Sequence, residues 1–246
     1  MNAALAQCKA EILRTLRNRK FVVMALLMPV IFYFIFTSTI DGNTEIGGIQ
    51  WKAYYLMSMT VFGIIGGSLN TISIRFAQER KQGWVQLLKI TPLPSGTYVF
   101  SKIAAQSILN LGVIVLMFII GSVFKGVQLS FVQWMLCGLW IWIGVLPFLA
   151  LGTLIGTIRS VEIVQVVSQV LFMGMSALGG LWMPIQTMPS VMQHIAQWLP
   201  SYRYGQGAWN IIAGSAVDWT GIVVLAAYVV VFMILSSYMI KRQEAV

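Results

Sequence analysis

Residues that could support acid–base or metal chemistry are few in this chain of 246 residues. His194 is the only histidine, and the two cysteines, Cys8 and Cys137, stand far apart in the sequence. Zinc sites need about three or four such ligands close together. A phosphate-binding G-x-x-x-x-G-K-[ST] sequence is also missing. We therefore expect no metal site, no cofactor bound by this chain, and no ATP hydrolysis by the chain itself.

One segment has the composition of a contact surface, residues 75–102, RFAQERKQGWVQLLKITPLPSGTYVFSK. Its first part is rich in charge and in helix formers. We predict a water-facing helix that continues from the preceding apolar run and ends at Gly83. A short second helix would then present Trp84 and two leucines, and Pro92 and Pro94 would stiffen the following connection. Exposed tryptophan and leucine rimmed by charge are typical of a protein–protein interface.

The rest of the chain indicates an all-α membrane protein. Hydrophobic residues make up 58% of the chain and charged residues only 9%, with a mean hydropathy of +0.82. About a quarter of residues are charged in soluble domains. Since about 20 apolar residues cross a bilayer as a helix, we predict six transmembrane helices in a single domain covering residues 1–246. The predicted spans are 21–40, 52–74, 103–124, 131–158, 163–183 and 219–240.

The basic residues indicate which ends of the spans face the cytoplasm. Thirteen of the 16 lysines and arginines precede the first span, lie within residues 75–102, or occur at Arg159 and in the C-terminal tail. The positive-inside rule assigns such segments to the cytoplasm. Both termini are therefore predicted to be cytoplasmic, as an even number of spans requires. The net charge of +9 then faces the anionic inner leaflet, so we expect membrane lipid and no nucleic acid as a partner.

Two further segments are predicted to lie beside the spans. Residues 1–20 place apolar side chains, beginning with Leu5, at helical spacing, with Glu11 and Arg14 on the opposite face. This pattern predicts an amphipathic elbow helix in the membrane interface, and a basic leader that only sets topology is the alternative. Residues 184–214 are too short for two more crossings. We predict a re-entrant or extracellular helical hairpin there, with a flat helix on the outer leaflet as the alternative.

Polar residues within the spans bear on a possible transport path. Such residues most often hydrogen-bond between helices, but together with neighbouring aromatic and methionine residues they would suit an amphipathic cargo. No carboxylate is expected at mid-membrane, and we find no inverted repeat and no broken mid-membrane helix. These features disfavour an ion-coupled secondary transporter. The candidate residues of the path are Tyr33, Met57, Phe62, Gln165, Ser168 and Gln169.

Two stretches of the chain resemble the type-two ABC exporter permeases. ERKQGWVQLLKITPLPSGTYVFSKI resembles that family's E-x-x-x-G-x-x-x-x-L-x-x-T-P-[LV]-x loop. GGLWMPIQTMPSVMQHIAQWLPSYRYGQG resembles its G-x-x-[FW]-P-I-x-x-M-P-x-x-x-x-x-[IL]-x-x-x-L-P-x-x-[YW] stretch. Both occur in the family's order with six predicted spans around them, as in short bacterial half-transporters related to drug-resistance and sodium-efflux permeases. Trp84 departs from the family, which more often has a small or polar residue there.

The resemblance implies the permease subunit of an ATP-driven exporter that moves an amphipathic or hydrophobic drug, lipid or peptide outward. The loop after the second span would carry a coupling helix that docks on a separate ATPase, which binds ATP and magnesium. Two ATPase subunits and a second, identical or different, permease chain would complete the complex in the bacterial plasma membrane, with spans two and five near the shared seam. A membrane sensor or scaffold without transport is the alternative. The candidate coupling residues are Glu79, Arg80, Gly83, Trp84, Leu87, Leu88, Thr91 and Pro92.

Overall fold

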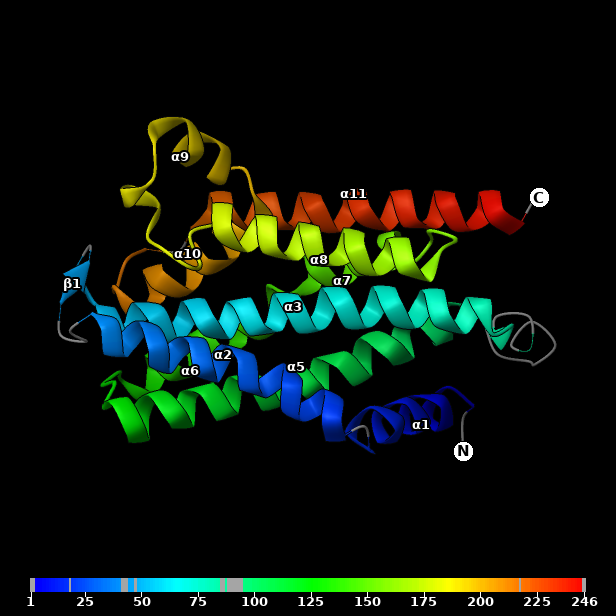
Figure 1. Cartoon of the computed structure of the whole chain (residues 1–246), viewed down its shortest axis with the longest axis horizontal. Coiled ribbons are helices and arrows are strands. Elements are labelled where there is room, and N and C mark those ends of the chain that lie inside the picture. The colour runs from blue at the N-terminus through cyan, green and yellow to red at the C-terminus, as the bar shows by residue number, and fades with distance from the viewer. Residues whose placement is uncertain are drawn as a thin grey trace.

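The computed structural model is a bundle of long helices (Figure 1). It describes residues 3–17, 19–40, 44–46, 48–84, 87, 95–216 and 218–244. The helices are α1 (Ala3–Arg17), α2 (Arg19–Thr39), α3 (Trp51–Lys81), α5 (Ser95–Lys125), α6 (Phe131–Ile143), α7 (Leu146–Ile155), α8 (Val161–Leu178), α9 (Ser190–Ala196), α10 (Pro200–Ile212) and α11 (Trp219–Glu244). In Figure 1, α1 and the C-terminus lie toward one end of the bundle, and α9 lies toward the other.

Five of the described helical segments are long and apolar enough to cross a membrane. They are α3, α5, the α6–α7 pair, α8 and α11. α2 stands where the first span was predicted and has 21 residues, which are apolar from Phe21 onward apart from threonine and serine at its end. Its fully described apolar part, Leu26–Thr39, is by itself shorter than a bilayer crossing. The regular structure of the described residues is helical apart from two short paired strands, β1 (Glu45–Ile46) and β2 (Ile49–Gln50). Six spans remain a prediction.

α3 is the central helix of the bundle. In its most apolar stretch 83% of the residues are buried inside the chain, against 11% for α11. It packs against α2, α5, α7, α8 and α10. Glycines bring these helices close, because a Cβ atom on Gly63 would lie 2.8 Å from the Pro29 side chain of α2, and one on Gly66 would lie 2.7 Å from the Phe172 ring of α8.

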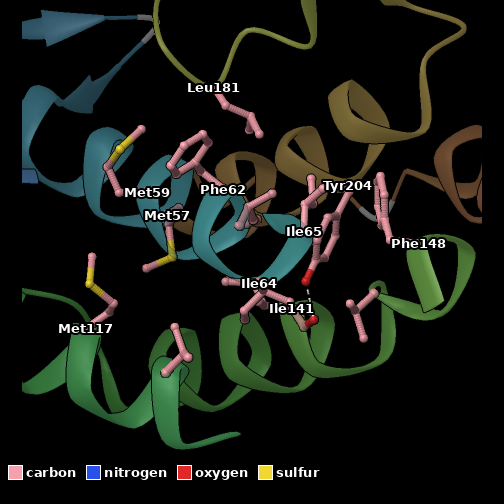
Figure 2. Packing of buried hydrophobic residues seen from close by; sticks show 14 of the residues in the cluster. Met57, Met59, Phe62, Ile64, Ile65, Met117, Ile141, Phe148, Leu181 and Tyr204 are labelled. Carbon is pink, nitrogen blue, oxygen red and sulfur yellow. Dashed lines mark hydrogen bonds between the residues drawn. The ribbon is translucent and has the colours of Figure 1, made fainter. Parts of the chain in front are cut away.

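The hydrophobic core lies along α3. Met57, Ile64 and Ile65 of α3 are fully buried. Figure 2 shows them with Met117 of α5 to one side and Tyr204 of α10 close to Ile65. The spans are thus packed around a helix that also extends past the apolar run at the α1 end of the bundle.

The fourth predicted span, 131–158, is two helices. α6 ends at Ile143, and α7 begins at Leu146 with Pro147 in its first turn. Proline lacks an N–H group and fits the first turn of a helix, but not its interior. The interpretation that no helix in the apolar spans is broken is therefore wrong here, and Gly144 followed by Pro147 was the sequence signal for the break.

Residues 184–214 form a helical hairpin with one buried arm. α9 is largely exposed, and Trp198 just after it is 71% exposed. α10 instead packs against α3, α6, α8 and α11, and its residues Tyr204 and Ala208 are fully buried. α10 is therefore folded back into the bundle, whereas α9, which carries the apolar stripe, lies on its surface. A re-entrant position of this hairpin in the membrane remains a prediction.

Candidate functional site

The end of α3 carries the turn that was predicted from the sequence. α3 runs past residue 74 to Lys81. The chain then turns through Gly83, whose φ of 77° is the left-handed conformation that glycine adopts without strain. The Gly83 N–H donates to the carbonyl of Arg80 at 3.0 Å, and the Leu87 N–H donates to the carbonyl of Gly83 at 3.1 Å. The predicted extension of this helix, and its end at Gly83, are confirmed.

Two large apolar side chains are exposed just beyond the turn. Trp84 is 45% exposed and Leu87 is 55% exposed. Both residues are helical. The structure thus places an apolar corner next to the charged end of α3. The other candidates in this segment, Leu88, Thr91 and Pro92, lie outside the described residues.

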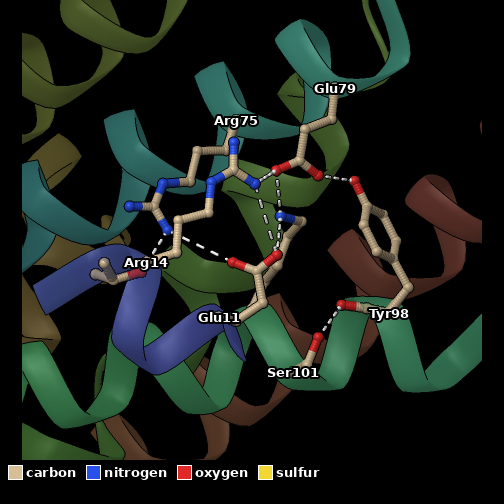
Figure 3. A network of polar contacts seen from close by, with 8 residues as sticks. Glu11, Arg14, Arg75, Glu79, Tyr98 and Ser101 are labelled. Atoms are coloured by element: carbon tan, nitrogen blue, oxygen red, sulfur yellow. Dashed lines mark hydrogen bonds and ion pairs between the residues drawn. The ribbon is translucent and has the colours of Figure 1, made fainter. Parts of the chain in front are cut away.

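Glu79, one turn of helix before Gly83, is buried beneath this corner. Its Oε1 atom lies 2.7 Å from Nζ of Lys102 in α5 and 2.7 Å from Nη1 of Arg14 in α1. The Tyr98 hydroxyl donates to its Oε2 atom. Figure 3 shows these groups converging from three helices. The expectation that the charges of this segment face water is wrong for Glu79, whose side chain is 3% exposed, because Lys102 supplies a counter-charge inside the protein.

α1 contributes a second carboxylate to the same cluster. Oε1 of Glu11 lies 3.1 Å from Nζ of Lys102, and its Oε2 lies 3.8 Å from Nη1 of Arg75. Arg75 also donates to Oγ1 of Thr15 at 2.6 Å. Glu11 is buried and Leu5 is exposed, so the two residues lie on opposite faces of α1, and it is the face with Glu11 that packs against the bundle. A position of α1 in the membrane interface remains a prediction.

We call Glu11, Arg14, Arg75, Glu79 and Lys102 the charged cluster. It joins α1, α3 and α5 and holds two carboxylates among three cations. Removing charges from water costs several kcal/mol per ion unless partners and hydrogen bonds replace the water. The cluster therefore stabilises one arrangement of the three helices.

Arg80 connects the end of α3 to the opposite side of the bundle. Its guanidinium donates to the carbonyl of Thr157 at 2.8 Å and to the carbonyl of Ile158. Both carbonyls follow the last turn of α7, where a cation is favoured. Nζ of Lys81 lies 3.6 Å from Oε1 of Glu162. This ion pair is exposed to solvent, so it contributes little to stability. Glu79 and Arg80 thus anchor the corner within the chain, while Trp84 and Leu87 form its outer surface.

The partners of Glu79 were not predicted from the sequence. Lys102 was assigned to the loop, yet the structure places it in α5 with a side chain that is 1% exposed. Tyr98 and Arg14 were not named as partners of Glu79, and Glu11 was not named as a partner of Lys102. The available signal was a lysine directly before an apolar helical run, because a cation at such a position needs a counter-charge.

The candidate path residues are divided between the core and the surface of the bundle. Ser168 is buried and lies 2.6 Å from the Ser73 hydroxyl, whereas Gln165 and Gln169 are exposed on α8. The remaining three, Tyr33, Met57 and Phe62, are buried in the core. Within the described ranges, no three His, Cys, Asp or Glu side chains are grouped as metal ligands.

Comparison with known proteins assigns the chain to a family. A family model described as "ABC-2 family transporter protein" matches residues 44–238, which include both stretches that carry the resemblance. The protein named "Putative transport permease YvfS" from Bacillus subtilis (strain 168) is 46% identical over 246 residues, which is 100% of both chains. The chain therefore belongs to the ABC-2 transporter family and is a multi-pass membrane permease of the bacterial plasma membrane.

Proposed function

We propose that the chain is the permease subunit of an ATP-driven exporter and that Trp84 and Leu87 bind a separate ABC ATPase subunit. Membership of the ABC-2 family supports the class of partner. The observation that carries the proposal is the exposure of both side chains at the end of a continuous helix of 31 residues. Truncating a tryptophan at the centre of an interface often costs about 2 kcal/mol or more of binding free energy.

The anchoring of α3 supports transmission of movement from this corner. A helix of 31 residues is about 46 Å long, so a force on Gly83 acts on a rod that reaches the far end of the bundle. Glu79 ties that rod to α1 and α5, and Arg80 ties it to the chain following α7. Closure of ATPase subunits would displace these helices together, as in rigid-body switching.

The finer composition of the complex is also part of the proposal. Two ATPase subunits would bind two permease chains, identical or different, and each permease would have six spans with cytoplasmic termini. α2 would be the first span and α1 the elbow. Because α3 is surrounded by its own chain, the exposed face of α8 with Gln165 and Gln169 suits the seam better than α3. The cargo would be amphipathic or hydrophobic.

The ATPase contact is tested by replacing Trp84 and Leu87 with aspartate. An affinity-tagged full chain expressed in its own bacterium should be recovered with an ABC ATPase. In the Trp84→Asp/Leu87→Asp variant, recovery of the ATPase should fall at least about 10-fold. A loss of about 1.4 kcal/mol of binding free energy already weakens binding tenfold. Trp198→Asp is the matched control, because Trp198 is also exposed but lies beside α9 at the other end. Undiminished recovery in the double variant would contradict the proposal.

Transport is tested separately in vesicles that contain the purified permease and ATPase. ATP should drive the movement of a hydrophobic fluorescent dye across the vesicle membrane. If the ATPase binds but neither dye movement nor dye-stimulated hydrolysis occurs, a scaffold becomes the better interpretation.

A further inference from the structure

The outward face of α8 carries two glutamine side chains. In the most apolar stretch of this helix only 33% of the residues are buried inside the chain, and the helix packs mainly against α3, α7, α9 and α10. Gln165 and Gln169 both lie on the exposed part. Among the residues that the structure describes, neither amide has a hydrogen-bond partner. The fold of a single chain therefore leaves these polar groups facing outward.

Gln169 lies too deep in the membrane for its amide to reach water. It is the ninth of the 18 residues of α8, so it stands about 12 Å from the start of a helix that is about 27 Å long. The hydrocarbon core of a bilayer is about 30 Å thick, which places Gln169 near the midplane. Lipid chains form no hydrogen bonds, and an unsatisfied polar group is costly there. The amide of Gln169 therefore needs a polar partner from outside the chain.

The surface around Gln169 has the residue spacing of a helix–helix contact. Val166, Gln169 and Met173 follow one another at intervals of three and four residues, as do the contact positions of paired helices. Val166 is 63% exposed and Met173 is 36% exposed, so the apolar neighbours of the amide are uncovered as well. We call these three residues the α8 stripe. A single polar residue within such an apolar stripe fixes which positions of two helices meet.

We propose that the α8 stripe packs against the same stripe of a second copy of the chain, with the two Gln169 amides hydrogen-bonded to each other. The proposal rests on the permease assembly proposed above and makes its two permease chains identical. A second copy has the same orientation in the membrane, so a two-fold axis along the membrane normal places its Gln169 at the same depth. A primary amide has two donor hydrogens and an acceptor oxygen, so two identical amides can pair. A different chain would need a matching group at this depth.

The contact is tested by cysteine crosslinking of the purified full chain in vesicles without an ATPase. A Cys8→Ser/Cys137→Ala background removes both native cysteines. Val166→Cys keeps Gln169 and should give disulfide-linked dimers on oxidation. Val230→Cys is the matched control, because Val230 is 56% exposed near the middle of α11, and it should give dimers only through random collisions. No dimer at Val166→Cys, or equal yields at the two positions, would overturn the proposal.

The amide itself is tested by adding a second substitution to Val166→Cys. Gln169→Met keeps the length of the side chain but removes the hydrogen-bonding group, so the dimer yield should fall several-fold. Gln169→Asn keeps an amide and should retain more of the dimer than Gln169→Met. An unchanged yield in Gln169→Met would show that the amides do not pair.

The same cysteine distinguishes a second copy from a different permease. In membranes of the native bacterium, Val166→Cys should again give the dimer of this chain, and crosslinking to another membrane protein in its place would overturn the proposal. The ATPase contact is measured separately by recovery with the tagged chain. If the ATPase is recovered but the dimer is missing, this inference alone fails. If the dimer forms but the Trp84→Asp/Leu87→Asp variant still recovers the ATPase, only the proposed ATPase contact fails.

Discussion

The two ends of the bundle are stabilised by different interactions. At the α1 end, the charged cluster joins three helices through ion pairs such as Glu79–Lys102. At the α9 end, α10 is fixed by close packing. A Cβ atom on Gly207 would lie 2.1 Å from the Trp140 ring, and Nε1 of Trp140 donates to the carbonyl of Tyr204 at 2.8 Å. We call Trp140, Tyr204 and Gly207 the aromatic contact.

The two ends differ in how much rearrangement of their contacts they tolerate. Ion pairs can exchange partners, because the attraction falls off slowly with distance and Lys102 already lies close to both Glu11 and Glu79. Closely packed side chains cannot exchange contacts in this way, since an added atom must displace its neighbours. The charged cluster can thus keep α1, α3 and α5 joined through small adjustments as they move together, and the aromatic contact is suited to holding α10 in place. The following substitutions test this contrast.

The largest effect is expected at the charged cluster. Lys102→Met leaves two buried carboxylates short of a cation, and breaking a buried pair in this way costs about 3–5 kcal/mol. Equilibrium unfolding of the purified chain in detergent measures the loss. Lys125→Met, near the other end of the same helix, should cost much less, because Lys125 is only partly buried and contacts uncharged groups, the Ser38 hydroxyl at 3.4 Å and the Phe34 ring at 5.1 Å from its centroid. Equal losses in the two variants would show that the cluster does not stabilise the fold.

An intermediate effect is expected at the aromatic contact. Gly207→Ala forces a methyl group into the Trp140 ring, and overpacking of this kind costs about 1–3 kcal/mol. Gly174→Ala is the matched control, because no atom lies within 4 Å of its Cβ position and alanine favours the helix by up to about 1 kcal/mol. A stable Gly207→Ala variant would mean that Trp140 can move and that this end is not rigid.

A smaller effect is expected from the Tyr204 hydroxyl. It donates to the carbonyl of Ile141 near the end of α6, as Figure 2 shows. Tyr204→Phe removes this hydrogen bond but keeps the ring, so the free energy of unfolding should fall by about 0.5–1.5 kcal/mol. The exposed Tyr238 provides the comparison, since Tyr238→Phe should change stability by less than about 0.5 kcal/mol. Equal changes in the free energy of unfolding of the two variants would show that the Tyr204 hydrogen bond does not stabilise the fold.

The smallest effect is expected from Arg14, the outermost cation of the charged cluster. Its side chain is 51% exposed, and Lys102 lies at the same distance from Glu79. Exposed pairs contribute about 0–1 kcal/mol, so Arg14→Gln should be nearly neutral and its effect should shrink with added salt. Arg17→Gln, at an exposed position of the same helix, is the control. A loss as large as that of Lys102→Met would show that the partners cannot exchange.

Several features were predictable from local sequence. The long apolar runs identified the helices now seen as α3, α5, α8 and α11, because hydropathy depends only on neighbouring residues. Gly83 marked the end of α3 because few other residues adopt a positive φ without strain. The exposure of Trp84 was predictable because so short a charged loop has no core of its own that could bury the side chain.

Other features were decided by tertiary structure. Glu79 pairs with Arg14 across 65 residues, and Lys102 pairs with Glu11 across 91 residues. Composition identified these groups as charged and placed them in water, which would be their most favourable position if each helix were alone. Packing of α1 and α5 against α3 removed the water and made counter-charges the better environment. The burial of α10 and the scattering of the path candidates have the same cause, since the neighbours of a helix face depend on how the whole bundle assembles.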